Sequence, residues 1–209
     1  MDTWEMVAAE RTELADLMDQ FSNSDWTTPS LCEGWTVRIV AGHLIGWFER
    51  SLPTMLLKVL QTRSFDRTVD FFAGVDASLP VDAIIAELRT NADNCFKPPL
   101  ALPEQALMEV LVHGLDIRWP LGLPTVRPDD RVNRVLDFLT TKQATRAVVP
   151  KNLFDGLRIT TSDSDWIHGQ GAELTGPSAS LVLALLGRTV GFEELTGRGV
   201  EMLRSRMMR

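Results

Sequence analysis

Apolar side chains recur every three or four residues in five segments of the chain, and this spacing predicts five amphipathic helices. In the first segment the apolar positions are Trp4, Val7, Leu14, Leu17 and Phe21. The five helices are expected over residues 4–22, 37–52, 81–96, 104–119 and 129–147. The first four are expected to pack together as a bundle, so the pattern predicts a mainly α protein.

Prolines and turn-forming residues separate these helical segments. Thr36 stands where the N-cap of the second helix is expected, and Pro53 is expected to kink or stop that helix. A polar stretch at residues 61–70 and Pro80 precede the third helix, and no helix is predicted for that stretch. Pro120 is expected to end the fourth helix.

The hydrophobic period changes after residue 147. Residues 154–161 and 165–174 predict two short strands of a hairpin, and Pro177 is expected to open a further helix. The chain is therefore expected to divide into a helical bundle at 1-125 and a second part at 126-209, which consists of a linking helix and a small α/β appendage.

The composition is that of a globular protein, and its charge argues against one class of partner. Hydrophobic residues make up 44% and charged residues 23% of the 209 positions, so a core can be buried. The net charge of -7 argues against nucleic acid, because that affinity depends on clustered Lys and Arg. No signal-peptide pattern or membrane-spanning apolar run is present, so a cytoplasmic protein without a membrane partner is expected. Cys32 and Cys95 form no CxxC pair and are expected to be reduced.

Three side chains predict a metal site. Glu109 and His113 are four residues apart, so on a helix they project from one face, where both can bind one ion. His43 is the natural third ligand, because it lies on another amphipathic helix among small or apolar neighbours. Two neutral imidazoles and one carboxylate suit zinc, with a fourth position left to water or substrate. The alternative is that Glu109 and His113 form an ordinary surface pair and that His43 packs in the core.

The spacing of the acidic residues and histidines narrows the kind of metal site. A dinuclear iron centre needs Glu-x-x-His on two helices, and a zinc protease needs HExxH, but the chain contains neither. The neighbours of Glu109 are apolar, and an unpaired carboxylate among them would be costly. A mononuclear site therefore remains as the metal hypothesis.

Four further side chains near these segments have two possible roles each. Asp116 is expected either to orient a ligand imidazole and contact the cofactor, or to be a solvent-exposed helix acid. Trp47 either packs in the core or forms a wall of the cofactor pocket. Cys32 is expected to pack as a small hydrophobic residue rather than to bind metal. His168 is expected to be structural or to lie on the surface.

Three segments of the sequence, considered together, are similar to one protein family. They are SLCEGWTVRIVAGHL, EVLVHGLDIRWPLG and GAELTGPSASLVLALLGR, which extend from about Leu31 to Arg188. This combination resembles the mycothiol-dependent maleylpyruvate isomerase family of the DinB-like superfamily. The resemblance implies a DinB-type four-helix bundle with a small C-terminal α/β appendage. It also implies one zinc ion bound by His43, Glu109 and His113.

The resemblance further implies that the low-molecular-weight thiol mycothiol serves as cosubstrate or coenzyme. The metal would hold the thiol sulfur as a thiolate that attacks a small electrophilic substrate, as in a transferase or an isomerase. Arg188 is a candidate catalytic contact for an anionic group, and its alternative is a cation near the end of a helix. A non-catalytic metal- or thiol-binding module and a purely structural metal are the competing hypotheses. The oligomeric state is left open, with a homodimer as one alternative.

Overall fold

The structure is a computed structural model that describes residues 1–46, 48, 52–97 and 101–207. These residues form two compact units, Met1–Pro124 and Thr125–Arg209, and each unit is described here by itself. No helix of the described residues is long and apolar enough to cross a membrane. The expected division into domains at 1-125 and 126-209 stays a prediction.

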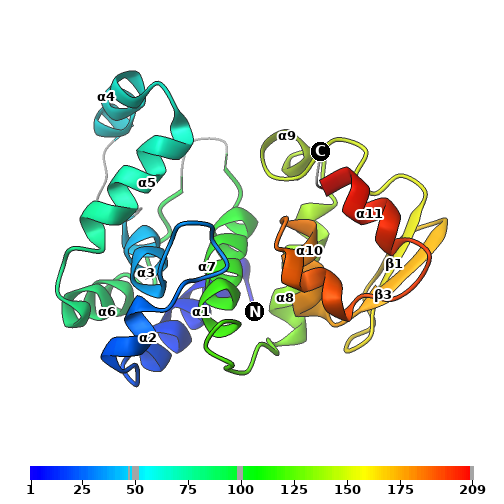
Figure 1. Ribbon diagram of the computed structural model, residues 1–209, viewed down its shortest axis with the longest axis horizontal. Helices are drawn as coiled ribbons and strands as arrows, with labels where there is room; N and C mark the ends of the chain where they lie inside the picture. Colours follow the sequence, from blue (N-terminus) through cyan, green and yellow to red (C-terminus); the bar gives the residue numbers. More distant parts are fainter. Residues whose placement is uncertain (47, 49–51, 98–100, 208–209) are drawn as a thin grey trace. The chain divides into compact units, whose positions relative to one another are not determined.

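Among its described residues, the first unit contains helices and no strand (Figure 1). Its helices are α1 (Thr3–Met18), α2 (Asn23–Thr27), α3 (Val37–Ile45), α4 (Leu52–Thr62), α5 (Phe65–Asp76), α6 (Val81–Thr90) and α7 (Pro103–Arg118). Helices α1, α3, α6 and α7 pack against one another as the predicted four-helix bundle. Their shared core includes Leu14, Val40, Ile84, Leu88 and Val110. The expectation of a mainly α protein built on a bundle is therefore confirmed.

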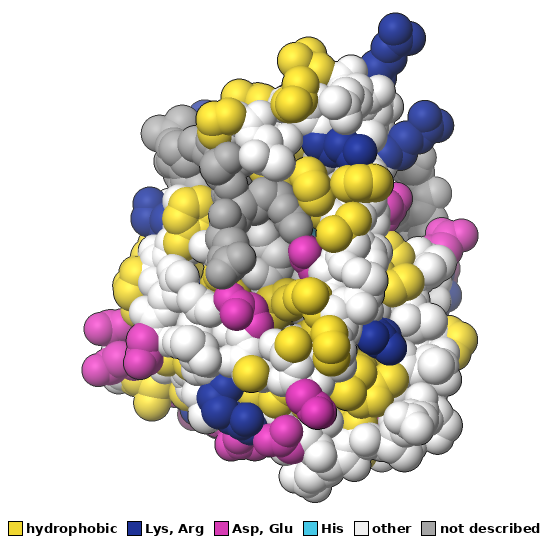
Figure 2. Space-filling view, turned by 90° about the vertical axis from the view of Figure 1, so that its left-hand side faces the viewer, with side chains coloured by type: hydrophobic (Ala, Val, Ile, Leu, Met, Phe, Trp, Pro, Cys, Tyr) yellow, Lys and Arg dark blue, Asp and Glu magenta, His cyan; other side chains and the backbone are white. Residues whose placement is uncertain are grey.

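The second predicted helix divides where the sequence pattern did not show a break. Thr36 is its N-cap, as predicted, and its hydroxyl accepts a hydrogen bond from the Ile39 N–H. Helix α3 ends at Ile45, and α4 begins at Leu52. Pro53 thus lies in the first turn of α4 and does not stop a helix, because a proline needs no hydrogen-bond acceptor there. In α4 the side chains of Leu56, Leu57 and Leu60 are exposed. Figure 2 shows hydrophobic side chains at the top of the view, the end of the first unit at which Figure 1 draws α4.

No helix was predicted for the polar stretch at residues 61–70, but most of it belongs to α4 and α5. The Ser64 hydroxyl caps α5 by accepting a hydrogen bond from the Arg67 N–H. The buried side chains of α5 are the small ones of Thr68 and Ala73, whereas the larger Phe65 and Phe71 are exposed. Helix α5 packs closely on α3 at Gly42, where a Cβ atom would lie 2.6 Å from the Ala77 nitrogen.

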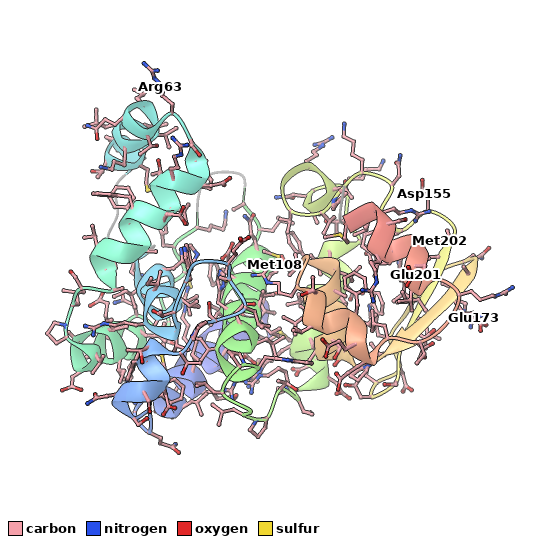
Figure 3. All side chains as sticks on the ribbon, viewed as in Figure 1. Arg63, Met108, Asp155, Glu173, Glu201 and Met202 are labelled. Atoms are coloured by element: carbon pink, nitrogen blue, oxygen red, sulfur yellow. The ribbon has the colours of Figure 1, made fainter. Side chains whose placement is uncertain are left out.

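The second unit combines helices with a small mixed sheet. Its elements are α8 (Asp129–Leu139), α9 (Ala144–Ala147), β1 (Leu157–Thr161), β2 (Ile167–Gly169), β3 (Ala172–Gly176), α10 (Ser178–Leu185), the 3-10 helix η1 (Thr189–Glu194) and α11 (Val200–Met207). Helices α10 and α8 pack against each other, and η1 packs on α10. In Figure 3 the labels on Glu173, Glu201 and Met202 mark β3 and α11. The small C-terminal α/β part is therefore confirmed.

The sheet has the order β2-β1-β3, with one strand more than predicted. Strands β1 and β2 form the predicted antiparallel hairpin, in which Ile159 lies opposite His168. The segment expected as one second strand turns at Gly169 and Gly171, and both glycines have positive φ. The chain then returns as β3, which pairs in parallel with β1. A Cβ atom at Gly171 would lie 2.1 Å from the Gly156 carbonyl oxygen, so this turn requires glycine.

Candidate metal centre

Two neighbouring helices of the bundle bring three potential metal ligands together. His43 lies in the last turn of α3, whereas Glu109 and His113 lie one turn apart on α7. Met108, which is labelled in Figure 3, marks the position on α7 directly before Glu109. The Glu109 Oε2 atom is 3.6 Å from His43 Nε2 and 3.3 Å from His113 Nε2. Every ligand atom of the trio lies within 4.8 Å of the others.

These distances fit one shared metal ion. A tetrahedral ion with bonds of about 2.0–2.2 Å holds its ligand atoms about 3.3–3.6 Å apart. The two measured separations of Glu109 Oε2 from the imidazole nitrogens fall in that range. They are longer than an ordinary N–H···O hydrogen bond of about 2.9 Å. The donor set therefore suits a divalent ion such as zinc, which binds imidazole nitrogen and carboxylate oxygen.

Asp116 lies behind His113 and orients its ring. The Asp116 side chain is fully buried, and its Oδ2 atom lies 2.9 Å from His113 Nδ1. In the arrangement that suits metal binding, Nδ1 donates its proton to Asp116 and Nε2 presents its lone pair toward Glu109. Because Asp116 is fully buried behind His113, its expected contact with a cofactor stays a prediction.

Cys32 also belongs to this centre, although the sequence pattern indicated only packing. Its thiol donates a hydrogen bond to Asp116 Oδ2 over 3.1 Å, and its sulfur lies 3.7 Å from His113 Nδ1. The loop that carries Cys32 is held on α7, because the Leu31 N–H donates to the Asp116 carbonyl oxygen. Cys32 lies in the loop between α2 and α3, and its contact with α7 depends on the tertiary structure. In the sequence, a role at the site is indicated for Cys32 only by its place in the SLCEGW segment.

Cys32, His113 and Asp116 form a second group that could hold a metal ion. This group uses the Nδ1 atom of His113, whereas the His43, Glu109 and His113 group uses Nε2. The separations of 2.9 and 3.1 Å around Asp116 are those of hydrogen bonds rather than the edges of a tetrahedral site. His43, Glu109 and His113 are therefore the better metal site. Asp116 and Cys32 act on that site through their hydrogen-bonded contacts with His113.

The three ligands depart in different directions from their ordinary pKa values. Burial lowers the pKa of the His43 imidazole and outweighs the hydrogen bond with Glu109. Burial also acts to lower the pKa of His113, but hydrogen bonds with Asp116, Cys32 and Glu109 outweigh it and raise that pKa well above its ordinary value. For Glu109 burial acts to raise the pKa, but hydrogen bonds with the two histidines outweigh it and hold that pKa far below its usual range. Glu109 is therefore an anion at neutral pH.

The three ligands line a cavity of about 350 Å³, which we call the metal cavity. The Glu109 side chain is 34% exposed and forms part of the cavity wall. Trp35 forms part of the wall, with its ring centroid 5.2 Å from that of His43. The Trp35 Nε1–H donates to Asp70 on α5 over 3.0 Å, so α5 holds the indole ring in place.

Two other residues predicted for the site do not belong to the described part of the first unit. Trp47 lies outside the described residues. Arg188 belongs to the second unit, directly before η1, and its Nη1–H donates to the Leu186 carbonyl oxygen over 2.9 Å. Its catalytic role stays a prediction. His168 also lies in the second unit, where its ring stacks on Trp166.

Comparisons with known proteins agree with this fold. Residues 7–118 match the family model described as Mycothiol maleylpyruvate isomerase N-terminal domain. A crystal structure of the mycothiol-dependent maleylpyruvate isomerase is similar over 94% of this chain and 91% of that chain, with a TM-score of 0.60 and 14% identity. A histidine-to-alanine mutant of that isomerase has the same identity and coverage, with a TM-score of 0.57. No curated protein matches the sequence. At 14% identity the two structures show a shared fold.

Proposed function

Because this chain belongs to the mycothiol maleylpyruvate isomerase N-terminal domain family, we propose that it is an enzyme in which His43, Glu109 and His113 hold one divalent metal ion. The proposed metal is zinc, which favours imidazole and carboxylate ligands with one position left open. The proposed cosubstrate is mycothiol, and the reaction is its transfer to a small electrophile or a thiol-assisted isomerisation. The observation that carries the proposal is the convergence of three ligand atoms at the wall of the metal cavity.

The side chains around the cavity have separate roles in this proposal. A divalent ion held there would lower the pKa of a bound thiol, so that its sulfur reacts as a thiolate at neutral pH. Asp116 is a positioning residue, because it fixes the ring of His113. Trp35 supplies an aromatic wall beside the ligands. Arg188 is proposed as the contact for an anionic group of the thiol or the substrate.

Metal analysis of the purified protein tests the proposal directly. We expect about one divalent ion per chain in the wild type and a loss of most of it in His43→Ala, because that variant removes one of three ligands. His168→Ala is the matched control, since it removes a histidine of the second unit and should keep the metal. Cys32→Ser should also keep it, because its thiol contacts Asp116 rather than the ion. Wild-type protein without stoichiometric metal under non-chelating conditions would refute the proposal.

Thiol binding forms the second part of the test. Calorimetric titration with mycothiol is expected to give binding by the metal-loaded wild type and none by the chelator-treated protein or by Glu109→Ala. Equal binding with and without metal would contradict the role of the ion. If metal and thiol both bind but electrophiles are not consumed, the chain is a binding module of the same fold.

A further inference from the structure

The first unit contains a second cavity, which shares Glu109 with the metal cavity. This cavity has a volume of about 80 Å³, and we call it the Arg11 cavity. Its walls are mostly apolar and include Leu44, Phe48, Leu88 and Val110. Such a lining suits a small ligand with a hydrophobic body, and specificity then depends on the few polar groups present.

Arg11 of α1 is the buried polar group of this cavity. Its side chain lines the cavity, and the residue is only 7% exposed. Its Nη1 atom donates to three carbonyl oxygens at the end of α6 and beyond, those of Asn91, Ala92 and Asn94, over 3.1, 3.0 and 2.7 Å. These bonds tie α1 to α6, and they use one of the three nitrogen atoms of the guanidinium group.

The other two nitrogen atoms of Arg11 remain available to a ligand. Among the described residues, Arg11 has no carboxylate partner, and its Nε and Nη2 atoms have no hydrogen-bond acceptor. They are not among the described buried atoms that lack a partner, and the Arg11 side chain lines the cavity. The Phe48 ring lies 4.8 Å from the guanidinium carbon, which favours the cation but accepts no ordinary hydrogen bond. Burial lowers the pKa of Arg11 to about 10, so it stays charged at neutral pH.

The two cavities carry opposite charge. The metal cavity is lined by Glu33, Asp66 and Asp70 in addition to Glu109, and no Lys or Arg belongs to its described lining. The Arg11 cavity is lined by Arg11 and Lys97, and Glu109 is the sole acid of its described lining. The Glu109 carboxylate is held toward the metal centre, 3.6 Å from His43 Nε2 and 3.3 Å from His113 Nε2. Before a metal ion binds, an anionic group is therefore favoured in the Arg11 cavity over the metal cavity.

We propose that the Arg11 cavity binds a small monocarboxylate with an otherwise apolar body. The carboxylate accepts hydrogen bonds from Nε and Nη2 of Arg11, in the forked arrangement that guanidinium and carboxylate form. The apolar part of the ligand packs against the leucine and valine side chains of the walls. Assignment of this ligand as the electrophile of the reaction rests on the proposed function, whereas its binding does not.

A chemical-shift titration with butanoate and butanamide tests the proposal, because the two probes have the same size and differ in charge. We expect the wild type to prefer butanoate by roughly tenfold, as one charge-assisted hydrogen bond produces. Arg11→Met should lose the preference, and Arg11→Lys should keep part of it. Arg38→Met is the matched control, since Arg38 also donates to carbonyl oxygens, those of Ala77 and Leu79, but does not line the cavity.

A cavity-filling variant keeps the test decisive if Arg11→Met fails to fold. Ala106 lines the same cavity, so Ala106→Leu should abolish butanoate binding while circular dichroism shows an intact fold. Equal affinity for the two probes, or unchanged butanoate binding in Ala106→Leu, would overturn the proposal. The titration is repeated on chelator-treated protein, where butanoate binding should persist. Loss of thiol binding with butanoate binding retained would count against the proposed function alone.

Discussion

Replacement of Asp116 by asparagine changes the metal centre without touching a metal ligand. The asparagine would keep the size of the side chain and one oxygen acceptor, but it would remove the negative charge that faces His113 Nδ1 at 2.9 Å. The hydrogen bond from the Cys32 thiol at 3.1 Å would also lose its charged acceptor. The His113 ring would then be oriented less firmly and would be less basic, so we expect weaker zinc binding.

The size of this effect and its pH dependence follow from the contacts. Loss of a carboxylate that supports a metal-bound imidazole costs about 10–100-fold in metal affinity, or about 1.4–2.7 kcal/mol. Asp116 is also the foremost group that raises the pKa of His113 against the effect of burial. Below its pKa the His113 ring carries an extra proton, which zinc must displace in order to bind. The zinc affinity of the wild type should therefore rise with pH until the pH passes the raised pKa of His113. In Asp116→Asn the affinity should level off at a lower pH, and the deficit should be largest under alkaline conditions.

Competition with a chromophoric zinc chelator from about pH 6 to about pH 9 measures the zinc affinity and its dependence on pH. That interval brackets the ordinary histidine pKa and values raised above it. Asp70→Asn serves as the control, because Asp70 lines the same cavity but hydrogen-bonds to Trp35. It should leave zinc affinity within about threefold of the wild type, which is less than the effect of losing a carboxylate bonded to a ligand. The reasoning is refuted if Asp116→Asn binds zinc as tightly as the wild type at every pH, or if Asp70→Asn loses as much affinity.

Three further predictions concern stability. Gly42→Ala should lower the free energy of unfolding by about 1–3 kcal/mol in urea titrations, because its Cβ would lie 2.8 Å from the Ala73 carbonyl oxygen. Gly114→Ala is the control: a Cβ at Gly114 would meet no atom within 4 Å, so this variant should not lower the free energy of unfolding. In metal-free protein, urea titrations should show the wild type to be more stable than Glu109→Gln above about pH 4.3. Because the pKa of Glu109 is lowered in the folded protein, this difference in the free energy of unfolding should shrink as the pH falls further. Zinc at a free concentration of about 100 times its dissociation constant should add about 2.7 kcal/mol, which raises the melting temperature in calorimetry by roughly 5–10 °C over chelator-treated protein. Equal stability of the two glycine variants, a pH-independent Glu109 advantage, or superimposable melting curves would each contradict the corresponding statement.

Features that depend on neighbours along the chain could be predicted from the sequence alone. Helical periodicity located α1, α6 and α7, since one face of each is buried in a common core. The four-residue separation of Glu109 and His113 placed both side chains on one face of α7, because a helix repeats every 3.6 residues. Three short segments were sufficient to indicate the family, which the match over residues 7–118 confirms.

Which distant residues meet was visible only in the tertiary structure. Helix α5 was missed because it packs through the small side chains of Thr68 and Ala73, and the charged residues between its apolar positions made the segment resemble a polar stretch. The same lack of a local signal hid the parallel pairing of β3 with β1. Cys32 reaches Asp116, and Arg11 reaches the end of α6, across 84 and 81 residues of chain. Contacts of this kind depend on how helices pack in space, which spacing along the sequence does not encode.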